Sequence, residues 1–120
     1  MTDAMKERAQ ELGRLLGQSE EYKALSRARQ RLTEDEGAMS SMAKLDGLER
    51  EVAVALHNGQ EPPEATKEEY ERLFTELQSS AVYQGLVAAQ ANFDKILQRV
   101  NEEISRGIET GSQSRIILPS

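Results

Sequence analysis

Two stretches of the sequence carry the same pattern: Ser19-x-x-Tyr22-x-x-Leu25-x-x-Ala28 and, 61 residues later, Ser80-x-x-Tyr83-x-x-Leu86-x-x-Ala89. The same offset pairs further apolar positions, Leu12 with Leu73, Leu16 with Leu77, and Leu32 with Phe93. Apolar spacings of three and four residues place side chains on one face of a helix. The sequence therefore predicts an all-α fold that contains two similar helical hairpins.

About five helices are expected, near residues 3–16, 20–32, 38–56, 66–78 and 81–108. Ser19 and Ser80 are placed to cap the second and last helices, because a serine hydroxyl accepts from the first free backbone N–H groups. Thr33-x-x-Glu36 and Thr66-x-x-Glu69 have the spacing of capping boxes for the third and fourth helices. The polar stretch at residues 35–37 predicts a break between the second and third helices.

The chain is predicted to be one domain over residues 1–109. Its two hairpin copies cover about residues 3–58 and 64–109, and residues 59–63 link them. Gly59 is a helix-ending signal, and Pro62 and Pro63 cannot continue a helix. Residues 110–120 have the composition of a flexible tail. Its apolar end, residues 116–118, either frays or docks on a neighbouring molecule.

Composition excludes several classes of function. The chain has 120 residues, a formal charge of −6 and no cysteine. A net acidic chain is repelled by nucleic acid and by anionic membranes unless basic residues cluster locally. Without cysteine there is no disulfide, thiolate metal site or Fe–S cluster. The N-terminus lacks a signal-peptide pattern, and no stretch is apolar enough to span a membrane. We expect a cytoplasmic address and no membrane partner.

The last predicted helix carries a long apolar stripe, formed by Val82, Leu86, Ala89, Phe93, Ile96, Leu97, Val100, Ile104 and Ile108. At 1.5 Å per residue this helix is roughly 40 Å long, about the width of a small domain. Part of the stripe is therefore expected to overhang the core, and an exposed apolar stripe calls for a partner. We predict a homo-oligomer, with an interface at Phe93, Ile96, Leu97, Val100 and Ile104.

A basic stripe lies on the second predicted helix, where Lys23, Arg27 and Arg31 are one turn apart. This stripe predicts a docking site for an acidic helix of a partner or for a phosphate backbone. Its alternative is an ordinary solvated face that pairs with nearby glutamates. No aromatic residue interleaves with the stripe, so RNA binding is the weaker form of the docking hypothesis.

The residues favour no catalytic chemistry. His57 is the only histidine, and no metal-ligating residue lies one turn before it. The many carboxylates fall on polar helix faces, whereas a catalytic pair needs a carboxylate in an apolar pocket. No phosphate loop, nucleophile elbow or zinc-protease motif is present. The sequence predicts a non-enzyme with no cofactor and no metal. We predict an adaptor or regulator that binds other proteins through its helices. A chaperone-like binder, using exposed Met42 and Leu45, is a further alternative.

The packing residues also form a longer set: Leu12-Gly13-x-Leu15-Leu16, Ser19-x-Glu21-Tyr22-x-x-Leu25-x-x-Ala28, a mid-chain glycine, Leu73-x-x-x-Leu77-Gln78 and Tyr83-x-x-Leu86. Over roughly residues 6–107, and most specifically over 12–28, this set resembles the YlbF/YmcA family of small bacterial helical proteins.

The resemblance implies an all-α, oligomeric, non-catalytic regulator. Members act in competence, sporulation and biofilm pathways, partly through a complex that modulates an RNA-degrading endonuclease. Some members bind Fe–S clusters through cysteines, a property that this cysteine-free chain cannot share. Membership of the same complex therefore does not follow, and the family has no catalytic residues to carry over.

Overall fold

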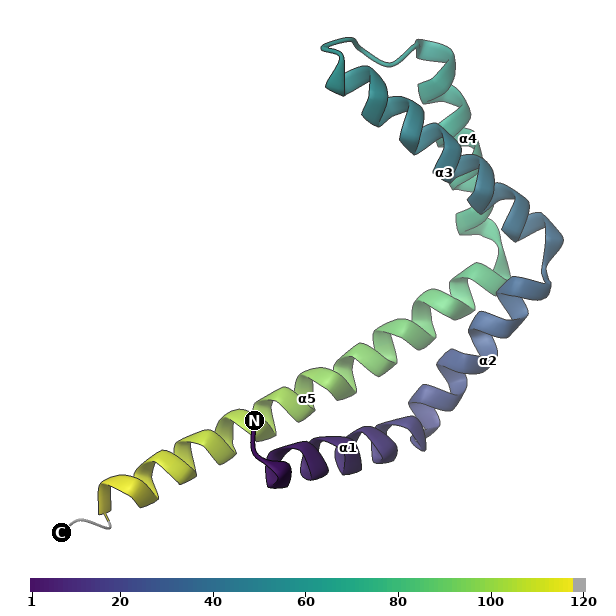
Figure 1. The fold of residues 1–120 in the computed structure, drawn as a ribbon. Coiled ribbons are helices and arrows are strands. Elements are labelled where there is room, and N and C mark those ends of the chain that lie inside the picture. Colours follow the sequence, from purple (N-terminus) through teal and green to yellow (C-terminus); the bar gives the residue numbers. More distant parts are fainter. Residues whose placement is uncertain (118–120) are drawn as a thin grey trace.

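A computed structural model describes the backbone of residues 1–117 and the side chains of residues 1–113. Within this range the chain forms five helices and no strand (Figure 1). Their bounds are α1 Asp3–Gly17, α2 Glu20–Glu34, α3 Glu36–His57, α4 Glu64–Ser79 and α5 Ala81–Ile117. The predicted all-α fold is confirmed.

The serines of the repeated pattern begin helices. Ser19 Oγ accepts from the backbone N–H of Tyr22 at 3.1 Å, and Ser80 Oγ accepts from that of Tyr83 at 3.3 Å. Each hydroxyl satisfies one of the donors that a helix leaves free at its start. The first four residues of each repeat unit therefore set the point where α2 or α5 begins.

The break before α3 is real, but its predicted capping box is wrong. Asp35 alone separates α2 from α3, and its carboxylate accepts from the backbone N–H of Ala38 at 2.9 Å. Thr33 stays in the last turn of α2, where its hydroxyl donates to the carbonyl of Arg29 at 2.9 Å. Asp35 caps α3 because it is the residue directly before the helix and its backbone is extended, as a capping residue requires.

The capping box predicted at Thr66-x-x-Glu69 is also wrong. The turn after α3 uses Gly59 with a φ of 72°, a conformation that glycine adopts readily. Pro63 then precedes α4 with a φ of −57°, and no side chain caps this helix start. The Pro63 carbonyl accepts from the backbone N–H groups of Thr66 and Lys67, so α4 begins directly at Glu64 and Thr66 lies inside its first turn.

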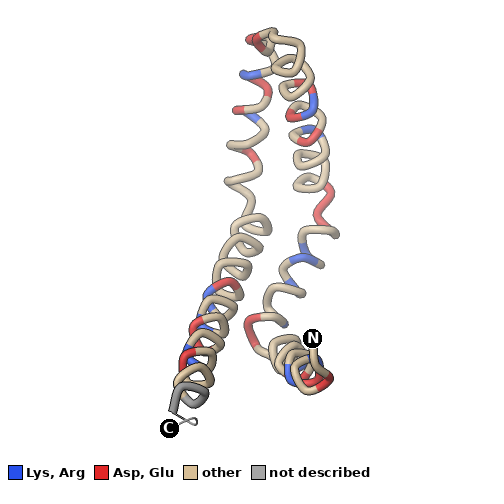
Figure 2. The backbone as a smooth tube through the Cα atoms, turned by 60° about the vertical axis from the view of Figure 1, so that its left-hand side comes forward, with Lys and Arg blue, Asp and Glu red and all other residues tan. Residues whose placement is uncertain are grey.

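The helices form a crescent with two arms. α2 lies beside the first half of α5 in the opposite direction, and α3 pairs with α4 in the other arm (Figures 1 and 2). The molecule measures 71 × 38 × 22 Å and has a radius of gyration of 21.9 Å. A compact domain of this length has a radius of gyration of about 14 Å. The chain is therefore extended, and each arm is little more than two helices thick.

The apolar core is small and divided into two clusters. Buried residues of the first, in the α3–α4 arm and the bend, are Leu32, Ala38, Leu45, Leu73 and Leu77. Those of the second, between α2 and α5, are Leu25, Ala28 and Ala89. Leu25, which is only 1% exposed, is the most buried of these core residues. Both clusters are built from Leu and Ala, as the helical pattern favours.

Equivalent positions of the repeat meet where α2 crosses α5. Ala28 and Ala89, which are 61 residues apart, share one buried cluster. Arg29 Nη2 donates to Gln90 Oε1 at 3.4 Å across the same offset. Contact between equivalent residues is what two copies produce when they pack about a local two-fold axis. The two copies of the repeat therefore pack against each other where α2 crosses α5.

The helix α5 extends beyond its predicted end. It runs through Ile117, whereas a tail was expected from Thr110. No helix-stopping residue intervenes before Pro119, and a lone Gly111 costs only about 1 kcal/mol. Thr110 also donates to the carbonyl of Arg106 at 3.0 Å. Residues 118–120, and with them the end of the proposed docking tail, lie outside the described residues.

The exposed Met42–Leu45 surface that a chaperone-like binder would use is contradicted. Leu45 is 6% exposed and Met42 is half-buried against the first core cluster, because both lie on the side of α3 that packs on α4. Helical spacing predicts Leu56 on the same inward face as Met42 and Leu45, but it is 62% exposed, because it lies in the last turn of α3, where no residue is buried.

Candidate interaction surfaces

The first candidate surface is a groove between α1 and the C-terminal half of α5, called the α1–α5 groove below. It encloses about 630 Å³ and is lined by Leu12, Glu21, Ile96, Arg99, Val100, Glu103 and Ile104. Ile104 is 49% exposed, and Leu15 of α1 and Ile108 of α5, outside the groove lining, are 61% and 66% exposed. The helix α1 buries none of its residues. The apolar rows on the two helices therefore remain open to water.

In the other copy of the repeat, the leucines at the positions equivalent to Leu12 and Leu16 are buried. Leu73 and Leu77 of α4 are 2% and 5% exposed in the first core cluster. Their counterparts Leu12 and Leu16 of α1 are only half-buried. Because equivalent residues differ so much in exposure within one chain, the open state of α1 is a local feature and not a property of the sequence pattern.

The cause of this difference lies in the helix that each leucine pair faces. α3 offers Ala38 and Leu45 to α4, and both are buried there. At the equivalent positions α5 carries Arg99 and Arg106. Arg99 lines the groove, and Arg106 pairs with Glu103 on the exposed face of α5. α5 therefore presents charged side chains to α1 at the positions where α3 presents buried apolar ones to α4. The groove stays open unless another molecule covers it.

The structure divides the five predicted interface residues into two groups. Ile96, Val100 and Ile104 line the α1–α5 groove. Phe93 instead packs on the cluster of α2 and α5, and its ring meets Tyr22 edge-on with centroids 5.4 Å apart. Leu97 is half-buried and lies outside the groove lining. The role of all five residues in an interface stays a prediction.

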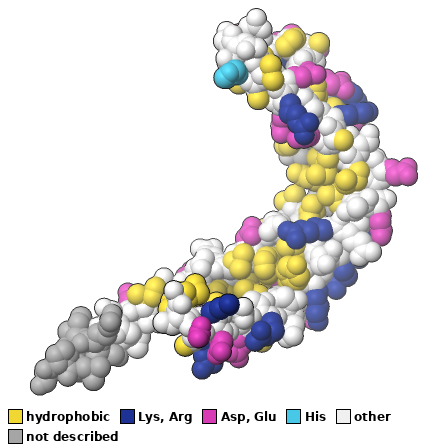
Figure 3. Space-filling model, viewed as in Figure 1, with side chains coloured by type: hydrophobic (Ala, Val, Ile, Leu, Met, Phe, Trp, Pro, Cys, Tyr) yellow, Lys and Arg dark blue, Asp and Glu magenta, His cyan; other side chains and the backbone are white. Residues whose placement is uncertain are grey.

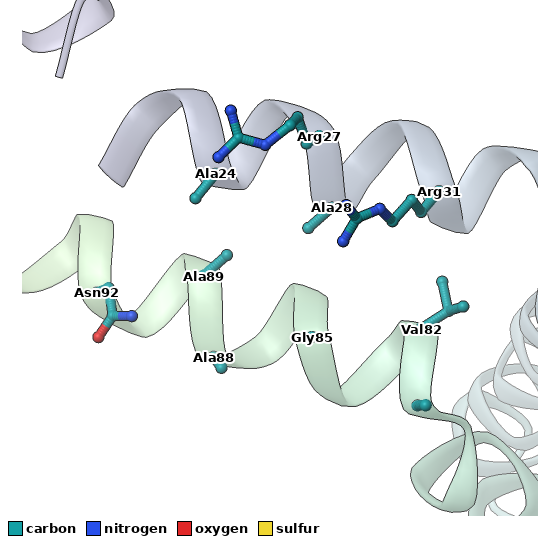
Figure 4. A pocket seen from close by; sticks show the side chains of 10 residues that line it. Ala24, Arg27, Ala28, Arg31, Val82, Gly85, Ala88, Ala89 and Asn92 are labelled. Carbon is teal, nitrogen blue, oxygen red and sulfur yellow. The ribbon is translucent and has the colours of Figure 1, made fainter. Parts of the chain in front are cut away.

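A second groove, the α2–α5 groove, lies between α2 and the first half of α5 (Figure 4). It encloses about 530 Å³. Its floor consists mainly of small residues, Ala24, Ala28, Ala81, Gly85, Ala88 and Ala89, and Val82 and Asn92 complete it. Arg27 and Arg31 line it from α2, and no acidic residue does. Sequence reasoning missed the floor, although its alanines and glycine recur on α5 at helical spacing.

Of the predicted basic stripe, the structure brings Arg27 and Arg31 to this groove but not Lys23. Lys23 Nζ lies 3.8 Å from Glu20 Oε1, on an exposed part of α2. The described part of the chain contains no ion pair of Arg27 or Arg31. The stripe is thus one solvated pair and two arginines without a carboxylate partner.

The α3–α4 arm has an apolar hollow of its own, about 400 Å³, beside Tyr70 and Pro62. The Tyr70 hydroxyl donates to Glu49 Oε1 at 3.3 Å, and its ring stacks on Phe74 at 6.0 Å. Desolvation, followed by the charge of Glu49 and this hydrogen bond, raises the pKa of Tyr70 above its usual value. The hydrogen bond links α4 to α3 and the ring stack lies within α4, so a structural role accounts for both contacts.

No arrangement for metal or acid–base chemistry is found where side chains are described. Residues 1–113 bury no polar or charged side chain. No group of three or more His, Asp or Glu in the described range could hold a metal ion. His57 is exposed at the end of α3. In the same range, no helix is long and apolar enough to cross a bilayer.

Comparison with known proteins identifies the family of this chain. A family model described as "Control of competence regulator ComK, YlbF/YmcA" matches residues 5–109. The chain belongs to the YlbF/YmcA family. The resemblance seen in the packing residues is thereby confirmed, and the family is a regulatory one. Among curated proteins no sequence matches the chain. The Fe–S clusters of some family members do not fit here, because the chain has no cysteine to bind them.

Proposed function

We propose that this member of the YlbF/YmcA family is a non-catalytic, cytoplasmic regulator that self-associates through the α1–α5 groove and binds other proteins. The family's description favours an effect on competence-type development. Control of RNA turnover, which the resemblance implies for some members, is the alternative. The observation that carries the proposal is the large surface that one chain leaves uncovered.

The uncovered surface can be compared with that of ordinary monomers. The accessible area is 9419 Å². A compact monomer of 13.4 kDa exposes roughly 6,500 Å², so this chain exposes roughly 2,900 Å² more. A standard interface covers about 800 Å² on each partner, and obligate interfaces cover more. The excess is large enough for a second copy together with a further partner.

The α1–α5 groove supports a second copy as the first of these partners. Apolar side chains gather along the arm that contains α5 and at the bend (Figure 3). The groove also carries Arg99 and Glu103 one turn apart. A second α5 that runs in the opposite direction can set each arginine beside the other copy's glutamate. Charges of both signs on one surface favour such self-pairing.

Single cysteines test this proposal, because the natural chain has none. We expect Val100→Cys to be joined into covalent pairs by a short bismaleimide at tens of micromolar, since Val100 lines the groove. Lys44→Cys, exposed on α3, is the matched control and should stay single. Non-reducing gels measure both. Equal linking of the two variants, or of neither, would count against self-association through this groove.

A further inference from the structure

We propose that the α2–α5 groove binds an acidic amphipathic helix of a partner protein. The inference rests on the protein-binding role proposed above and names the chemistry of the partner. It concerns a different surface from the α1–α5 groove, so the two proposals can fail separately.

The floor of the α2–α5 groove is shaped to receive a helix. On α5, Ala81, Gly85, Ala88 and Asn92 follow one another at spacings of three and four residues. They span 12 residues, or about 16 Å of helix. A Cβ atom added at Gly85 would meet nothing within 4 Å, so the space above it is open. Small side chains let helix axes approach to the short end of the usual 8–10 Å range.

The charges of the groove select an acidic partner. Arg27 and Arg31 stand one turn apart on α2, both exposed and without a carboxylate of their own in the described structure. By contrast, the α1–α5 groove contains two glutamates and one arginine. Arginine binds carboxylates with two parallel hydrogen bonds. A helix with Asp or Glu at i and i+4 matches the spacing of the two arginines.

The same observations argue against RNA. Single strands are held by aromatic side chains on which bases stack, and the groove lining has none. The nearby rings of Tyr22 and Phe93 already contact each other. Arg27 and Arg31 also attract a phosphate backbone only weakly, because the whole chain carries a charge of −6.

The test uses the full chain and a designed probe. The probe is a labelled, Ala-rich peptide of about 16 residues with Glu pairs one turn apart and Leu between them, long enough to populate a helix. Its counterpart has Lys in place of Glu. Fluorescence anisotropy should show saturable binding of the Glu peptide with a dissociation constant on the order of 100 µM, weakened by salt. The Lys peptide should not bind.

Two sets of variants locate the binding. Arg27→Glu with Arg31→Glu should weaken the Glu peptide by at least about tenfold and gain binding of the Lys peptide. Gly85→Leu should fill the groove and also weaken binding by at least about tenfold, while helix content is kept because leucine favours helix over glycine. Gly47→Leu on α3, equally open to added atoms, is the matched control and should bind normally.

Several outcomes would overturn the proposal. They are failure of the Glu peptide to bind, equal binding after Gly85→Leu, or binding of a single-stranded RNA in its place. Loss of self-association in the double arginine variant would instead identify the occupant as a second copy of this chain. The cysteine experiment on the α1–α5 groove is read separately, so either result can stand without the other.

Discussion

Replacing Ile96 and Val100 with Asp should convert the assembled protein into single chains. Both side chains line the α1–α5 groove and are half-buried already in one chain. In an assembly the new carboxylates would be buried in an apolar interface without partners, which costs several kcal/mol. We expect the dissociation constant to rise at least about a hundredfold, measured by sedimentation velocity at several concentrations.

A matched variant separates this effect from a general one. Val87 is also on α5 and is 51% exposed, but it lies outside the groove. Val87→Asp should leave the assembly intact, and circular dichroism should show that all three variants keep their helices. If the Ile96 and Val100 variant stays assembled, the interface lies elsewhere on the chain.

The second large effect is expected at Leu73. This residue is 2% exposed in the first core cluster, and Leu73→Ala should lower the free energy of unfolding by about 2–5 kcal/mol. An ordinary domain of 120 residues is stable by roughly 6–18 kcal/mol, so the loss is a large fraction of the whole. Urea unfolding below the concentration of assembly measures it.

Leu12, the repeat counterpart of Leu73, provides the internal comparison. It is only half-buried in a single chain, so Leu12→Ala should cost the single chain less than about 2 kcal/mol. The same substitution should weaken self-association, because Leu12 lines the α1–α5 groove. Equal losses of unfolding free energy at the two positions would show that α1 is closed in solution, and would contradict an open α1–α5 groove.

Much of this architecture could be predicted because its signals are local. Ser19 and Ser80 cap helices through hydroxyls three residues before the N–H groups they bind, and that spacing is visible in the sequence. Gly59 likewise ends α3 through a backbone conformation that its own identity permits. The two wrong capping boxes show the limit of such signals. The residues directly before α3 and α4 are Asp35 and Pro63, and not the predicted Thr33 and Thr66.

The features that depend on packing could not be predicted. The helical pattern indicates which residues are apolar, but not that Arg99 lines an open groove between α1 and α5. Nor does it show that Arg27 and Arg31 share a groove with Ala81 and Gly85, which are more than 50 residues away in sequence. Both facts follow from the antiparallel crossing of α2 and α5, a long-range contact that a single helix pattern does not encode.

The mass of the unmodified chain in solution is the decisive quantity for self-association. Light scattering coupled to size exclusion, between about one and one hundred micromolar, should give a mass of at least two chains of 13.4 kDa. That result would mean that the open rows of α1 and α5 are covered by another copy. A mass of one chain throughout this range would contradict self-association and leave the α1–α5 groove without an occupant.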